Sequence, residues 1–339
     1  MHGNGFVSAN RPRRPQIPLW YRWAVIFSLG SHGDDVRRIE SRLADLKLYT
    51  GAIDGSYGGG VESAVKSFQN SHGLAADGVV GDETWKALFN GEAPPANQLA
   101  SAPLLQRCLA LTGAFETSVG VPDCYCGLAG DFDGQGLSFG VVQWNLGQGT
   151  LQPLLNEMLT GHEAVLRGIF HDHFADLQAM LAAPRNLQLQ WARNIQDPNR
   201  HTIFEPWKGL FQALGRTPEF QTIQVDHAAA LHAAAQNLCL RFGVSSQRAL
   251  ALMFDIRVQN GSIDQKTEAR IRADFATLPP DDEVARLRSI ANRRAEAAAP
   301  QFIEDVRVRK LTIANGRGTV HGITWDLEAQ FGISLHTAD

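Results

Sequence analysis

The chain has 339 residues, of which 44% are hydrophobic and 19% charged, so its composition is that of a folded protein rather than a disordered or a membrane protein. Its 31 Lys and Arg residues and 35 Asp and Glu residues give a net charge of −4, which argues against a nucleic-acid partner. Because single domains usually have about 150 residues, we expect two globular units.

Residues 1–30 are predicted to form a basic N-terminal arm. The arm has no acidic residue and contains Arg11, Arg13, Arg14 and Arg22. Its apolar run, from Ile17 to Leu29, is interrupted by Arg22 and is shorter than the about 20 residues that a membrane-spanning helix needs. Arginines before a short apolar run are also typical of a signal peptide, but no clear cleavage site follows. We therefore predict no stable membrane span and leave the export route open.

A unit of three helices is predicted over residues 31–92. Apolar residues recur at helical spacing in three segments, 36–46, 61–68 and 84–88. Turn-forming pairs, Asp54-Gly55 and Asp77-Gly78, separate these segments. Such turns set helices at angles that leave a shallow groove, where polar side chains can bind a glycan or a peptide.

The turns and helix ends of this unit carry a set of motifs, Tyr49-x-Gly51-x-Ile53-Asp54-Gly55-x-Tyr57-Gly58, Ala64-Val65-x-x-Phe68-Gln69 and Asp77-Gly78-Val79-Val80-Gly81. Over residues 33–90 the pattern resembles the bacterial peptidoglycan-binding domain type 1. It departs from that family at Lys47, where a glycine is usual, and at Gly60-Val61. The resemblance implies a wall-binding module whose partner is peptidoglycan.

A proline-rich stretch separates this module from the rest of the chain. Residues 91–103 are small and proline-rich and show no apolar periodicity, as is typical of a linker between domains. We predict a linker at residues 93–102 and a second domain at residues 103–339.

The second domain is predicted to be mostly helical, and its first helix carries a candidate acid. Apolar residues recur at helical spacing from Leu104 to Phe115, and Glu116 follows directly. A carboxyl group beside an apolar face at a helix end loses hydration, which favours its protonated form and lets it act as a general acid. Glu116 is therefore our candidate proton donor, and the alternative is a solvated glutamate without a role.

A glycine-rich segment, residues 127–145, carries the second candidate carboxylate. We predict a strand, a turn and a strand, with Asp131 and Asp133 at the turn, where glycines let the backbone approach a substrate. Glycoside hydrolysis requires two carboxyl groups on opposite sides of a sugar bond, one protonated and one ionised. We choose Asp133 as the base because it directly precedes Gly134-Gln135-Gly136, and we expect Asp131 to hold the turn at the edge of the substrate site.

Three residues after this turn are candidates for binding a sugar. Gln143 and Asn145 offer amides and Trp144 offers an aromatic face, a set suited to the N-acetyl and hydroxyl groups of a saccharide. Trp144 fits a place in the hydrophobic core equally well.

Neither a metal site nor a cofactor motif is predicted. Asp131-x-Asp133-x-Gln135-Gly136 matches the first half of a calcium-binding loop, but Val142 stands where that loop requires a glutamate. His162-Glu163 is followed by Leu166, where a zinc-protease helix has its second histidine. The cysteines do not form a Cys-x-x-Cys motif and are interpreted as buried free thiols: Cys108, Cys124, Cys126 and Cys239.

Three stretches of the second domain each carry a motif of a known family: Phe115-Glu116-Thr117-Ser118, Asp133-Gly134-Gln135-Gly136-Leu137-Ser138-Phe139-Gly140 and Phe254-Asp255-Ile256-Arg257-Val258-Gln259-Asn260-Gly261. They resemble the chitosanases of glycoside hydrolase family 46 and, more broadly, the lysozyme-like superfamily. The resemblance implies a mainly α chain, in which a lysozyme-like α+β domain with a small β-hairpin at its cleft follows the three-helix module.

The same resemblance implies roles for individual residues. Glu116 is the general acid and Asp133 the base that activates water in an inverting reaction. Asp255, which we include among the substrate-site residues, matches an acidic residue that pairs with arginines behind the acid, and the candidates for these are Arg293, Arg294, Arg307 and Arg309. Between the hairpin and Asp255 the sequence departs widely from the chitosanases, so the resemblance does not extend to chitosan specificity.

Together these features predict a hydrolase that cleaves the glycan strands of peptidoglycan, a muramidase that works as a monomer without a cofactor. It would act on the bacterial cell wall, in the periplasm or outside the cell. Two alternatives stay open: a chitosanase, and a wall-binding protein without activity.

Overall fold

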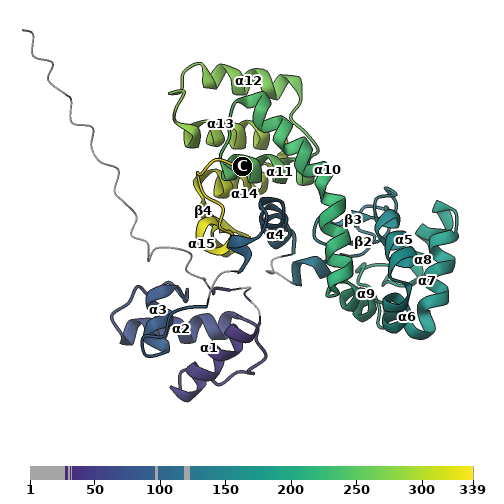
Figure 1. The fold of residues 1–339 in the computed structure, drawn as a ribbon, viewed down its shortest axis with the longest axis horizontal. Helices are drawn as coiled ribbons and strands as arrows, with labels where there is room; N and C mark the ends of the chain where they lie inside the picture. Colours follow the sequence, from purple (N-terminus) through teal and green to yellow (C-terminus); the bar gives the residue numbers. More distant parts are fainter. Residues whose placement is uncertain (1–26, 30, 32, 96–97, 118–122, 339) are drawn as a thin grey trace, which may run out of the picture.

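The computed structural model describes residues 27–29, 31, 33–95, 98–117 and 123–338, and these residues form a mainly α-helical chain (Figure 1). Two separate hydrophobic cores organise the described residues. One core contains buried residues between Phe27 and Leu88, and the other contains buried residues between Cys108 and Ile333. The predicted fold class, mainly α with two units, is confirmed in this respect.

The first core is enclosed by α1 (Asp34–Asp45), α2 (Gly59–Ser71) and α3 (Asp82–Leu88). Two buried polar side chains fix the turns between these helices. Glu40 Oε2 accepts a hydrogen bond of 2.8 Å from the amide of Gly55, and Gln69 Oε1 accepts one of 2.9 Å from the amide of Gly78. Both glycines have a positive backbone φ, 79° and 76°, which residues other than glycine rarely adopt. The two Asp-Gly turns are therefore rigid parts of the module.

The predicted arm lies outside the described residues except at its end, where Phe27 joins the first core. Phe27 and Val80 exchange backbone hydrogen bonds of 3.1 and 2.8 Å, and the Phe27 ring stacks on Trp85 at 5.5 Å. The Phe27 side chain is 7% exposed. The packing of the module thus begins before residue 31, where the sequence analysis places its start.

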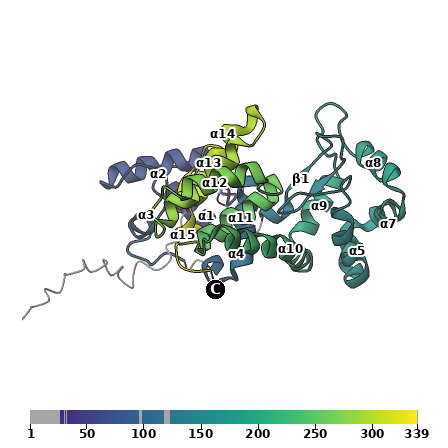
Figure 2. The same cartoon turned by 90° about the horizontal axis from the view of Figure 1, so that it is seen from above.

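The second core is built by many short helices in two lobes that α10 joins (Figures 1 and 2). One lobe contains η3 (Asp123–Cys126), α5 (Leu151–Gly161), α6 (Glu163–Phe170), η4 (His171–His173), α7 (Phe174–Ala182), α8 (Arg185–Asn194) and α9 (Trp207–Gly215). The other contains η2 (Gln98–Ser101), α4 (Leu104–Thr117), α11 (Gln247–Asn260), α12 (Gln265–Phe275), α13 (Glu283–Glu296), η5 (Pro300–Phe302), α14 (Ile303–Asn315) and α15 (Leu327–Phe331).

Helix α10 (Pro218–Phe242) has 25 residues and spans both lobes, a length of about 38 Å. The Thr217 side chain caps its first turn by accepting from the amide of Phe220, and Gly243 ends it in the left-handed conformation with φ 60°. At one end Phe220 stacks on Phe139 at 5.3 Å, and at the other Phe242 contacts Phe275 at 6.3 Å. The helix therefore belongs to the hydrophobic core of both lobes.

Two small antiparallel sheets complete the described part of the domain. The segment predicted as a hairpin forms three strands in the order β1 (Leu128–Ala129), β2 (Ser138–Phe139) and β3 (Trp144–Asn145). Phe139 pairs with Leu128 on one side and with Trp144 on the other. The second sheet pairs β4 (Arg317–Val320) with β5 (Ile323–Asp326).

Candidate active site

The candidate acid, Glu116, lies in the last turn of α4. The helix buries Leu111 and Phe115 in the second core, and Glu116 follows this apolar stripe with 26% of its side chain exposed. From the sequence we expect an apolar surrounding for this carboxyl group. The structure gives it a cation instead, because Arg309 Nη2 lies 2.8 Å from Glu116 Oε1.

Arg309 belongs to a buried charged network formed by α11 and α14. Its guanidinium donates to Asp255 at 2.6 Å from Nη2 and at 3.1 Å from Nε, and it packs over the Phe115 ring at 5.3 Å. Lys310 Nζ also pairs with Asp255 and donates to Gln259 Oε1 at 2.7 Å. Asp255 and Lys310 are completely buried and Arg309 is 2% exposed. Among the four candidate arginines, the structure thus places Arg309 between Asp255 and Glu116.

The opposite charges of this network stabilise the ionised forms of their neighbours. Burial alone would raise the pKa of Asp255, but Arg309 and Lys310 outweigh it and lower that pKa to about 2. Burial lowers the pKa of Lys310, and the neighbouring Asp255 carboxylate offsets only part of this effect. Because buried charges are stable only when paired and hydrogen-bonded, the network fixes the side chain of Arg309 and, through it, that of Glu116.

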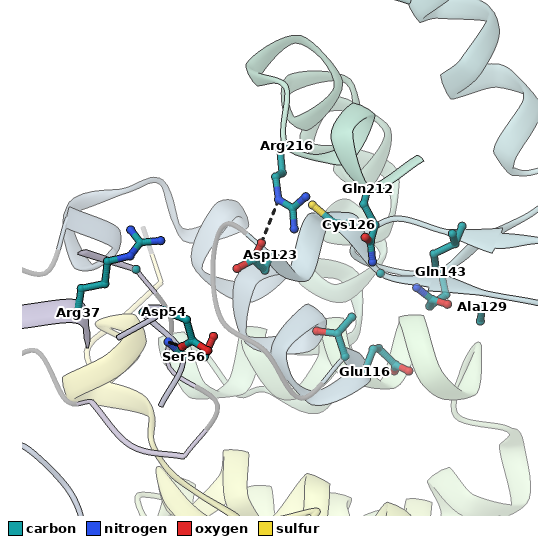
Figure 3. Close-up of a pocket in the computed structure, with 15 residues that line it drawn as sticks. Arg37, Asp54, Ser56, Glu116, Asp123, Cys126, Ala129, Gln143, Gln212 and Arg216 are labelled. Atoms are coloured by element: carbon teal, nitrogen blue, oxygen red, sulfur yellow. Dashed lines mark hydrogen bonds and ion pairs between the residues drawn. The ribbon is translucent and has the colours of Figure 1, made fainter. Parts of the chain in front are cut away.

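Glu116 faces a cavity of about 770 Å³ (Figure 3). From the second domain the cavity is lined by Glu116, Thr117, Asp123, Cys126, Gly127, Leu128, Ala129, Gln143, Gln212 and Arg216. Gly33, Arg37, Asp54, Gly55 and Ser56 of the three-helix module line its other side. The cavity thus brings the end of α4, the first strand of the small sheet and the first turn of the module together.

Gly127 allows the end of α4 and the small sheet to approach each other. A Cβ atom at this residue would lie 2.7 Å from Thr117 Cγ2 and 2.8 Å from Gln143 Nε2. Gln143, a predicted substrate-binding residue, lines the cavity and donates from Nε2 to the Gly140 carbonyl at 2.9 Å. The structure therefore brings Gln143 and Glu116 to one cavity.

Three polar residues of this cavity were not singled out as substrate-binding by the sequence. Arg216 Nε lies 3.3 Å from Asp123 Oδ1, and Gln212 precedes Arg216 by one turn of α9 (Figure 3). Gln212 and Arg216 are far from Glu116 in the chain, and neither belongs to a local motif. An arginine and a glutamine at the end of an amphipathic helix do not indicate, from the sequence, that they line a cavity together with a distant glutamate.

The candidate base, Asp133, is exposed in the loop between β1 and β2. Its Oδ1 accepts from the Gln135 amide at 3.0 Å, and it is not among the described residues that line the cavity of Glu116. Asp131 is 8% exposed, and its two oxygens accept from the Gly136 amide at 2.7 Å and from Arg193 Nε at 2.8 Å. Burial alone would raise the pKa of Asp131, but these two donors outweigh it and lower that pKa. Asp131 thus holds the turn and does not face the cavity.

Three further residues predicted to bind substrate are buried instead. Trp144 is 8% exposed and packs in the second core. Asn145 is 4% exposed and its side chain bonds to Ser138 Oγ at 2.9 Å and to the Gln148 amide at 3.0 Å. Asp255 is completely buried and is held by Arg309, Lys310 and the Thr112 hydroxyl. Strand pairing places Trp144 and Asn145 in the interior, and the charged network holds Asp255 there.

Within the described ranges, no group of three or more His, Cys, Asp or Glu residues is arranged to hold a metal ion. In the same residues, no helix combines the length and the apolar character needed to cross a membrane. All four cysteines are buried free thiols, as their spacing predicts.

Residues 32–88 match the family model described as a putative peptidoglycan binding domain. The chain contains a peptidoglycan-binding domain. This confirms the identification of the module from its Asp-Gly turns and helix motifs.

Curated relatives share this part of the chain. The chain is 44% identical over 63 residues to the N-acetylmuramoyl-L-alanine amidase CwlM of Mycobacterium tuberculosis, covering 19% of this chain and 16% of that protein. It is 39% identical over 74 residues to the zinc D-Ala-D-Ala carboxypeptidase of Streptomyces albus G, covering 20% and 28%, and 42% identical over 65 residues to a spore cortex-lytic enzyme of Bacillus subtilis, covering 19% and 21%. The chain therefore spans less than a third of the length of each of these relatives.

The solved structures similar to this chain include chitosanases. A chitosanase complex is 17% identical with a TM-score of 0.44, covering 67% of this chain and 98% of that one. The family 46 chitosanase of Gynuella sunshinyii in complex with chitotetraose is 14% identical with a TM-score of 0.43, covering 66% and 97%. At this identity and TM-score the likeness transfers no substrate and no catalytic residue.

Proposed function

We propose that this protein is a glycoside hydrolase that cleaves the glycan strands of bacterial peptidoglycan, and specifically a muramidase. The observation that carries the proposal is Glu116, a partly exposed carboxyl group that faces a large cavity and is fixed from behind by the buried network of Arg309, Asp255 and Lys310. The peptidoglycan-binding domain supplies the substrate class, because a linked module raises the local concentration of the polymer that both units recognise.

Glu116 is the proton donor in this proposal. Its carboxyl group gives a proton to the glycosidic oxygen while the bond between that oxygen and the anomeric carbon breaks. The Glu116 carboxylate that remains lies 2.8 Å from Arg309 Nη2, whose positive charge stabilises it. Because Asp255 and Lys310 hold Arg309 in place, this stabilisation requires no rearrangement during the reaction.

Asp133 is the base in this proposal. Its carboxylate takes a proton from a water molecule as the water oxygen attacks the anomeric carbon from the opposite face of the sugar, which inverts the anomer. A water fits between the two carboxyl groups when they are about 6.5–9.5 Å apart. The exposed β1–β2 loop that carries Asp133 would supply this group from across the sugar chain.

The chitosanase alternative is less well supported by the charges at the cavity. A cleft for a polycationic glycan attracts its substrate with unpaired carboxylates. Glu116 and Asp123 each face an arginine, Arg309 and Arg216, so among the described carboxylates that line the cavity only Asp54 of the module has no ion pair. A wall-binding protein without activity is the other alternative, and such a protein has no need of a fixed, accessible carboxyl group.

The test is digestion of purified peptidoglycan sacculi followed by mass spectrometry of the soluble muropeptides. Fragments with reducing-end muramic acid support the muramidase, whereas fragments with reducing-end glucosamine would identify a glucosaminidase. Release from colloidal chitosan instead of sacculi would favour the chitosanase, and no release from either polymer would leave a binding protein. The anomer of the first product, followed by NMR, separates inversion from retention.

A further inference from the structure

A second cavity, of about 380 Å³, lies between the end of α11, the end of α13 and the start of α14. It is lined by Gln259, Asn260, Arg294, Ala297, Ala298, Ala299, Phe302, Asp305 and Val306. None of these residues lines the cavity of Glu116. The second cavity is therefore separate from the first, and it lies in the lobe that contains α4 and Glu116.

Arg294 is an unpaired cation in the wall of this cavity. It is half-buried, its Nε is buried without a hydrogen-bond partner, and no described residue forms an ion pair with its guanidinium. Burial lowers the pKa of Arg294, and Asp264 offsets part of this effect. Asp264 is already used by α12, because its Oδ1 accepts from the Thr267 amide at 2.8 Å. The buried Nε without a hydrogen-bond partner costs free energy that a bound anion would offset.

The other polar groups of the cavity complement this cation. Asn260 Oδ1 is also buried without a hydrogen-bond partner in the described residues. Asp305, the carboxylate that lines the cavity, pairs with His321 Nε2 at 2.8 Å. Phe302 is 56% exposed and offers an apolar surface at the rim. A ligand with a carboxylate, hydrogen-bond donors and some apolar surface would satisfy all four residues.

The second cavity is connected to the candidate acid through the buried charged network. Gln259 lines it and accepts from Lys310 Nζ at 2.7 Å, and Lys310 shares Asp255 with Arg309, the partner of Glu116. Val306, another wall residue, precedes Lys310 by four residues, or ~6 Å along α14. A peptide extends over about 3.4 Å per residue, and the proposal below requires a stem attached to a sugar near Glu116 to span the distance to this cavity.

We propose that this second cavity binds a carboxylate of the peptide stem of peptidoglycan, with Arg294 as its main contact. The inference rests on the proposed function, and it distinguishes substrates, because peptide stems carry carboxylates whereas the amino groups of chitosan carry positive charge. The cavity would then select glycan strands that still bear their peptides.

The test is hydrogen exchange of the full chain, measured by mass spectrometry with two probes: a disaccharide-tetrapeptide muropeptide and the same disaccharide without its peptide. We expect the muropeptide to slow exchange in residues 294–306, and the peptide-free disaccharide to leave this segment unchanged. Arg294→Gln should remove the effect and weaken muropeptide binding by about tenfold or more, the usual loss for a hydrogen bond to a charged group. Equal protection by both probes, or protection confined to residues 33–90, would overturn the proposal.

Two further variants keep the test decisive. Ala299→Phe fills the cavity from an exposed residue without touching Arg294 and should also remove the protection. Arg288→Gln, which changes an exposed arginine of the same helix bonded to Asn315, should leave it intact. Because exchange reports binding and not turnover, peptide-dependent protection in a chain that releases no glycan fragments would overturn the proposed function alone. Unchanged protection in both Arg294→Gln and Ala299→Phe would overturn the proposal that this cavity binds the stem carboxylate.

Discussion

Replacing Asp255 by asparagine tests the buried network that fixes Glu116. Asp255→Asn keeps the size of the side chain but leaves the buried cations Arg309 and Lys310 without their shared carboxylate. Removing one partner of a buried ion pair costs about 3–5 kcal/mol. In a domain of this size each kcal/mol lowers the melting temperature by about 2–4 °C. We therefore expect the second domain of the variant to melt about 6–20 °C lower than in the unchanged protein.

Differential scanning calorimetry of the full chain measures this loss. The matched control is Asp226→Asn on the exposed face of α10, which should change stability by no more than about 0.5 kcal/mol. Adding Lys310→Met to Asp255→Asn removes one of the uncompensated cations and should restore part of the loss. If Asp255→Asn lowers stability by less than about 1 kcal/mol, the network is not held by charge and our reasoning about Glu116 fails.

The same network predicts how this stability depends on pH. The pKa of Asp255 falls from 3.8 to about 2 on folding, so its contribution is complete above pH ~4 and is lost as the pH falls towards 2. The difference between these two pKa values corresponds to about 2 kcal/mol. The stability difference between the unchanged protein and Asp255→Asn should shrink by about this amount between pH 5 and pH 2. A difference that stays constant over this range would contradict the ionised state of Asp255.

Two further predictions concern the loop and the module. Asp133→Asn should remove most turnover on sacculi while substrate binding persists. Asp131→Asn should lower the melting temperature more than the rate, because the Asp131 carboxylate bonds within the turn. An inactive Asp131→Asn beside an active Asp133→Asn would reverse the two roles. Residues 31–92 should fold alone and sediment with insoluble peptidoglycan, and residues 103–339 should keep activity at a reduced rate; a module that stays in the supernatant would refute its binding role. Because Phe27 packs on Trp85, a fragment that begins at residue 27 should be the more stable one.

The module could be predicted from the sequence because its signals are local. Helical spacing and the two Asp-Gly turns lie within short windows, and the turn glycines adopt the positive φ that makes them necessary. The contribution of Phe27 could not be predicted, since it depends on a backbone pairing with Val80 across more than fifty residues of chain.

In the second domain, local sequence patterns indicated only part of the candidate site. Glu116 could be proposed as the acid because an apolar helical stripe ends beside it, and Asp131 bonds within the turn where it was expected. The choice of Arg309 among four arginines needed the packing of α11 against α14, which no local spacing encodes. The burial of Trp144 and Asn145 likewise follows from the pairing of three short strands, where the sequence indicated only two.

The most direct test of the account is the release of reducing ends from purified sacculi by the unchanged protein and by Glu116→Gln. The substitution removes the transferable proton, so we expect a loss of at least ~10²-fold, the low end for general acid catalysis. Glu157→Gln, which changes an exposed glutamate of α5 paired with His227, is the matched control and should keep full activity. Both variants should melt like the unchanged protein. A folded Glu116→Gln protein that still releases reducing ends at the original rate would contradict the assignment of Glu116 as the acid.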